Sequence, residues 1–102
     1  MQSGFYQITE LQRRREKLEQ DHEVAKFQFI STELDMAITF CEMAITSDNQ
    51  DKTERNVGHA RRAYEAAQRF LPDAHLEPHM NQEISDKLTR LEPLIKHLRQ
   101  YK

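Results

Sequence analysis

The chain has 102 residues, of which 37% are hydrophobic and 31% are charged, and its formal net charge is −2. This length predicts a single domain, residues 1–102, with one modest core. The near-neutral charge excludes a global field that would attract nucleic acid or an anionic membrane surface. The single cysteine, Cys41, excludes an intramolecular disulfide framework. Because the sequence shows no leader pattern and no apolar run near the roughly 20 residues of a membrane span, we expect a cytoplasmic protein that does not bind membranes.

The composition predicts helices throughout. There are only two glycines and three prolines, and Glu, Gln, Arg, Lys, Ala and Leu, which favour helices, are frequent. No stretch alternates apolar and polar residues as a strand would. The predicted fold is therefore all-α: an antiparallel bundle of three main helices, over about 21–47, 51–71 and 78–101, preceded by an N-terminal helix or helical extension over about 1–20.

The segment Phe5–Ser47 contains neither proline nor glycine, and its second half is apolar on two sides. What we call stripe one has steps of three and four and predicts the core-facing side; its members are Phe27, Ile30, Leu34, Ala37, Ile38, Cys41, Ala44 and Ile45. What we call stripe two lies on nearly the opposite side and consists of Phe29, Met36, Phe40 and Met43. A helix with two apolar sides is expected to bury each of them against another helix or another subunit.

Stripe two continues towards the N-terminus as a heptad pattern. Counting by sevens, one register contains Ile8, Arg15, His22, Phe29, Met36 and Met43, and its companion contains Leu11, Leu18 and Ala25. This is the spacing of a coiled-coil seam, weakened by Arg15, His22 and the threonines at positions 32, 39 and 46. We call Leu11, Leu18 and the four residues of stripe two the seam.

Two architectures follow from this pattern. In one, the chain breaks near Asp21, and Phe5–Gln20 folds back over stripe two as a fourth helix. In the other, a single helix of roughly 60 Å runs from Phe5 to Ser47, and the seam pairs with a second copy. The second is favoured, because Phe5–Gln20 has only a thin apolar face.

The remaining two helices have one apolar face each. The predicted core-facing side of the segment 51–71 consists of Val57, Ala60, Ala63, Tyr64, Ala67, Phe70 and Leu71, and its alanines allow close helix pairing. The opposite face carries Arg55, Arg61, Arg62 and Arg69. Residues 55–71 have four basic and one acidic residue, whereas residues 21–54 have two basic and eight acidic residues, so we expect opposite charges to line the contact between these helices. The last helix has a leucine-rich face, and Pro93 predicts a kink or a restart near Glu92.

Candidate chemical groups do not assemble into a recognisable catalytic, cofactor or metal motif. Glu19 and His22 share a helix face at Glu-x-x-His spacing, but a carboxylate-bridged metal site needs a second copy of that motif and further acidic residues. His75, Glu77 and His79 lie too close together in a loop to form a typical zinc site. Cys41 belongs to the core side, where a thiol is a small apolar group. We therefore expect no enzyme activity, no cofactor and no metal.

The basic cluster Arg13–Lys17 and the arginine face of 51–71 are the candidates for contact with a nucleic acid. Glu10, Glu16 and Glu19 interleave with the first cluster, and no aromatic stacking platform accompanies either. Nucleic acid is therefore not an expected partner.

The functional hypothesis rests on stripe two, the apolar side of the helix that the predicted core does not use. We interpret the chain as a non-enzymatic helical interaction or assembly module that pairs with itself as a homodimer, or with another helical protein. The candidate interaction residues are those of the seam: Leu11, Leu18, Phe29, Met36, Phe40 and Met43. The alternative is a small sensor or carrier that holds an apolar ligand between its helices.

Overall fold

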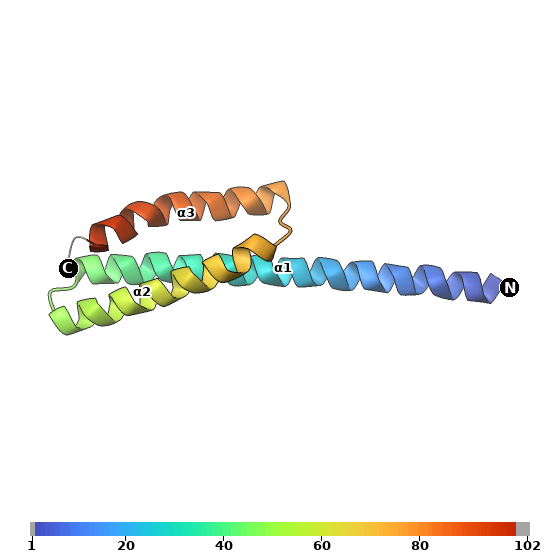
Figure 1. The fold of residues 1–102 in the computed structure, drawn as a ribbon, viewed down its shortest axis with the longest axis horizontal. Helices are drawn as coiled ribbons and strands as arrows, with labels where there is room; N and C mark the ends of the chain where they lie inside the picture. The colour runs from blue at the N-terminus through green and yellow to red at the C-terminus, as the bar shows by residue number, and fades with distance from the viewer. Residues whose placement is uncertain (1, 100–102) are drawn as a thin grey trace.

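The computed structural model describes residues 2–99, with side chains from residue 9 onward. It contains α1 (Gln2–Thr46), α2 (Gln50–Phe70), a single turn of 3-10 helix η1 (Leu71–Asp73) and α3 (Pro78–Arg99) (Figure 1). Residues 2–99 include no strand, so the prediction of an all-α fold is confirmed. Residues 100 and 101, which the sequence assigned to the end of the last helix, lie outside the described range.

The first helix is continuous over 45 residues. At 1.5 Å per residue it spans roughly 67 Å, which accounts for most of the 73 Å length of the protein. The helix passes through Asp21 without a break, so the alternative in which Phe5–Gln20 folds back over stripe two is wrong. The radius of gyration is 19.6 Å, well above the roughly 13 Å of a compact domain of this length.

The other two helices pack on the C-terminal half of α1 only (Figure 1). α2 returns along α1 in the opposite direction, and α3 then runs in the direction of α1 on another side. Both contact α1, whereas they make few contacts with each other. We call the region in which α2 and α3 pack on α1 the three-helix part. The N-terminal half of α1 consequently projects beyond it.

Local signals set the ends of the shorter helices. The Asn49 side chain caps α2 by accepting the backbone N–H of Lys52 at 3.1 Å. Pro72 follows α2 within η1, since a proline cannot continue the helical hydrogen bonds, and Pro78 occupies the first position of α3. α3 continues through Pro93 as one curved helix (Figure 1), so the predicted restart near Glu92 does not occur.

The core is formed by stripe one and one face of each partner helix. Ile30, Leu34, Ala37 and Cys41 are fully buried, and Phe27 and Ile45 are half-buried against them. The other buried apolar side chains come from α1 (Ile38, Ala44), from α2 (Ala60, Ala63, Ala67) and from α3 (Ile84, Leu91, Leu98). The small alanine side chains let α2 lie close to α1, as the sequence predicted.

Charged groups join α1 to α3 rather than to α2. Lys87 pairs with Asp35 at 2.9 Å, and Arg90 pairs with Glu42 at 3.0 Å. Beside them, the buried Ser31 hydroxyl donates to the Glu83 carboxylate at 2.9 Å and accepts from Lys87. Because every ion pair found between helices within residues 9–99 joins α1 and α3, the predicted charge complementarity between α1 and α2 is wrong. The carboxylates of Asp35 and Glu42 lie on the flank of α1 that faces α3.

Candidate interaction surfaces

The three-helix part ends at a pair of hydrogen bonds that tie the loop before α3 to α1. The Glu23 carboxylate accepts the backbone N–H of His75 at 2.9 Å, and the Lys26 ammonium donates to the carbonyl oxygen of Asp73 at 3.5 Å. The first of these bonds, with a smaller contribution from Lys26, lowers the pKa of Glu23 below its ordinary value. We call residues 2–22, which precede these ties, the arm. Every arm residue whose side chain is described, 9–22, is exposed.

The described side chains of the arm, residues 9–22, are stabilised mainly by contacts within the same helix. Its ion pairs join neighbouring turns of the same helix, Arg14 to Glu10 at 3.2 Å and Arg15 to Glu19 at 3.8 Å. Such exposed pairs stabilise a helix by a few tenths of a kcal/mol each. Most helical stability in proteins comes instead from packing of an apolar face, and the apolar residues of the arm, Leu11 and Leu18, are 61% and 69% exposed.

Stripe two is exposed on the three-helix part, in line with the arm leucines. Phe29, Met36 and Met43 are each between 41% and 47% exposed, which is high for side chains of this size and type. Phe40 lies at the edge, half-buried, with its ring centroid 4.9 Å from that of His59 on α2. Five of the six predicted interaction residues are therefore exposed along one line of α1, whereas Phe40 takes part in the contact between α1 and α2.

Phe70 adds to this surface, although the sequence placed it on the core face of its helix. Its side chain is 42% exposed, and its ring meets Phe29 edge-on with centroids 5.1 Å apart. The helical spacing of α2 puts Phe70 at the margin of the apolar face, where periodicity does not separate a buried residue from an exposed one. Phe70 therefore extends the exposed apolar surface around Phe29, and clustered exposed apolar side chains are typical of interaction sites.

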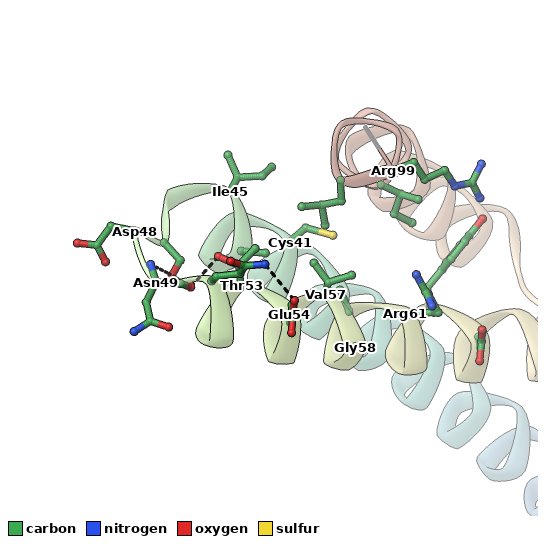
Figure 2. A pocket seen from close by; sticks show the side chains of 18 of the residues that line it. Cys41, Ile45, Asp48, Asn49, Thr53, Glu54, Val57, Gly58, Arg61 and Arg99 are labelled. Atoms are coloured by element: carbon green, nitrogen blue, oxygen red, sulfur yellow. Dashed lines mark hydrogen bonds between the residues drawn. The ribbon is translucent and has the colours of Figure 1, made fainter. Parts of the chain in front are cut away.

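A second surface is the open cleft between α2 and α3, with the end of α1 as its floor (Figure 2). Its volume is about 1030 Å³. The apolar lining consists of Cys41, Ala44, Ile45, Val57, Ala60, Tyr64, Ile95 and Leu98, and the charged residues at its edges are Asp48, Glu54, Arg61, Glu65 and Arg99. The cleft exists because α2 and α3 diverge from each other above α1.

The thiol of Cys41 in this cleft is poorly suited to nucleophilic chemistry. Burial, and to a smaller extent the neighbouring charge of Glu42, raise the pKa of Cys41. A reactive cysteine requires the reverse, a cationic and accessible setting that favours the thiolate.

The metal candidates from the sequence are not assembled into a site. Glu19 and His22 are both exposed on the arm, and Glu19 pairs with Arg15. His79 lies 3.6 Å from Glu77 at the surface. Within residues 9–99, no group of three or more His, Cys, Asp or Glu side chains is placed to hold a metal ion.

Comparison with known proteins gave no relatives: no protein-family model matches the chain, and neither the curated proteins nor the solved structures include a significant match. Within the described part of the chain, no helix has both the length and the apolar character needed to cross a membrane. The functional argument therefore rests on the surfaces themselves.

Proposed function

We propose that this protein is a non-enzymatic helical assembly module that self-associates through the seam. The observation that carries the proposal is the arm, whose described side chains, residues 9–22, are all exposed, and whose leucines are aligned with exposed Phe29, Met36 and Met43. Scattered apolar side chains are normal on protein surfaces, but apolar side chains that recur along one line of a helix, here with Arg15 and His22 between them, are typical of an interaction site.

Energetics support the same proposal. Full burial of a Leu, Met or Phe side chain contributes about 1.5–3 kcal/mol, and every seam residue except Phe40 keeps a large part of its surface in water. An isolated helix of the length of the arm is marginal in water. A partner that covers the seam would therefore stabilise the arm and remove apolar surface from water at the same time.

The test is a charge placed in the middle of the seam. Met36→Lys should shift the protein from dimer to monomer in light scattering on a sizing column, because a lysine would be buried in the interface. Thr89→Lys, at an exposed position of α3, introduces the same charge away from the seam and should leave the mass unchanged. Equal masses for the two variants would contradict the proposal.

The cleft supports a second candidate function, the binding of a small apolar guest. Its volume is in the range of small-molecule sites, and its floor is apolar. A hydrophobic dye should then bind to a monomeric variant such as Leu18→Glu, and Val57→Lys in the cleft wall should abolish that binding. Dye binding that is unaffected by Val57→Lys would locate the dye elsewhere and dismiss this function.

A further inference from the structure

We infer that the surface that covers stripe two is the arm of a second copy, laid antiparallel, in a two-fold symmetric dimer. The inference rests on the proposed self-association and adds its orientation and register. In this arrangement the three-helix parts extend from the middle of the dimer towards its opposite ends, and each arm lies along residues 32–46 of the other subunit's α1.

The heptad pattern selects the register. In an antiparallel pair, each residue of one seam register faces a residue of the companion register on the other chain. We choose the register in which the numbers of any two residues that face each other sum to 54. Leu11 then meets the partner's Met43, Leu18 meets the partner's Met36, and Ala25 meets the partner's Phe29. The overlap then covers residues 8–46 of both chains, roughly 58 Å of helix. Nearly the whole of α1 is used, and both exposed stripes are covered at once.

The polar residues that interrupt the seam favour the antiparallel orientation. In the same register, Arg15 faces the partner's Thr39 and His22 faces the partner's Thr32, so each interrupting group meets a small polar side chain. A parallel pair would instead set Arg15 against the partner's Arg15, and His22 against the partner's His22. Like charges facing each other across an interface oppose association.

The distribution of charge along α1 favours the same orientation. Residues 2–20 carry four basic and three acidic side chains, whereas residues 21–46 carry one basic and five acidic side chains. An antiparallel pair places the basic half of each helix against the acidic half of the other, and a parallel pair places the two acidic halves together. On one flank, Arg14 then faces the partner's Asp35 and the partner's Glu42. These two carboxylates already pair with Lys87 and Arg90 in each subunit, so Arg14 joins an existing charge network and adds little energy there.

α2 supplies complementary charge on the other flank. Its side of α1 is marked by Phe40, which contacts His59 of α2. One turn further along α2 lies the exposed Arg62. In the antiparallel register, Glu19 of the arm lies at the level of the partner's Arg62. The arm is thus apolar where it meets stripe two, basic towards the acidic flank of α1, and acidic towards the arginine face of α2.

Cross-linking of two single-cysteine variants tests the orientation. Leu18→Cys and Met36→Cys are prepared separately, mixed, allowed to exchange subunits and treated with a short bismaleimide. Covalent dimers should form in the mixture only, because each introduced cysteine is about 27 Å from its own copy in the antiparallel register. The wild-type chain, whose Cys41 is buried, and a mixture of Gln20→Cys with Met36→Cys, in which position 20 lies off the seam, are the controls.

The other outcomes are distinguishable. Efficient cross-linking of Leu18→Cys alone would show a parallel pair, which overturns this inference and leaves self-association intact. A dimer by light scattering that cross-links in neither experiment would also overturn it, because the seam residues would not meet. A monomeric wild-type chain at the same concentration would remove both this inference and the proposed function.

Discussion

The substitution Leu18→Glu isolates the contribution of the arm to assembly. Leu18 is 69% exposed and lies on the part of α1 that precedes the contacts with the rest of the chain. A glutamate at this position therefore removes nothing from the fold of a single subunit. In the proposed dimer, however, it would place a carboxylate against the partner's Met36.

The size of the effect follows from the exposed area. Full burial of a leucine contributes about 1.5–3 kcal/mol, and about two thirds of that is available at Leu18, so each site supplies about 1–2 kcal/mol. Two symmetry-related sites are lost in the dimer, which amounts to about 2–4 kcal/mol. At about 1.4 kcal/mol for each factor of ten, the dissociation constant should rise by roughly 30- to 1,000-fold.

Sedimentation equilibrium over a range of concentrations measures that constant. Gln20→Glu is the matched control, since it adds the same charge two residues away at an exposed position off the seam. Its dissociation constant should stay within a few-fold of the wild-type value. If Leu18→Glu associates as tightly as Gln20→Glu, the arm leucines are not in an interface and the reasoning is refuted.

Three further outcomes concern the three-helix part. Leu34→Ala should lower the free energy of unfolding by about 2–5 kcal/mol in a denaturant titration, because Leu34 is fully buried; a smaller loss would mean that the core rearranges around it. Cys41 should resist a thiol reagent near neutral pH until the protein is unfolded, since its pKa is raised and its side chain is buried; rapid reaction of the native protein would contradict this. Glu23 has a lowered pKa, so the stability it contributes is present above its ordinary value of 4.5 and is lost as the pH falls below that value; Glu23→Gln should weaken this part of the pH dependence of unfolding, and an unchanged profile would count against the hydrogen bond from His75.

Helical periodicity was sufficient to predict the fold class and most of the core. The steps of three and four in stripe one placed Ile30, Leu34 and Cys41 on one side of α1, and all three are buried. The alanine face of α2 could also be predicted, because small residues repeat there at helical spacing. These features depend on local geometry that any helix with this sequence would share.

The sequence did not predict which helices are joined by ion pairs. Net charge suggested that α1 would pair with the basic face of α2, but Asp35 and Glu42 lie on the flank of α1 that faces Lys87 and Arg90 of α3. The choice of neighbour is set by where the apolar faces pack, and exposed ion pairs contribute only about 0–1 kcal/mol each to it.

The sequence favoured a continuous helix near Asp21 but did not determine the path of the chain there. Helix propensity is the same for a continuous helix and for two helices joined at that point, and no proline or glycine forces a break. Phe70 shows the corresponding limit for single residues: at the margin of a helical face, exposure depends on how closely a neighbouring helix lies. The seam was found from its spacing, whereas its exposure became visible only in the fold.

The most direct test of the central claim is the mass of the wild-type chain in solution, measured by light scattering on a sizing column at two protein concentrations. The account predicts twice the protomer mass of 12.2 kDa at the higher concentration, with dissociation on dilution set by the dissociation constant. A mass of 12.2 kDa at both concentrations, with the arm still helical by circular dichroism, would contradict it.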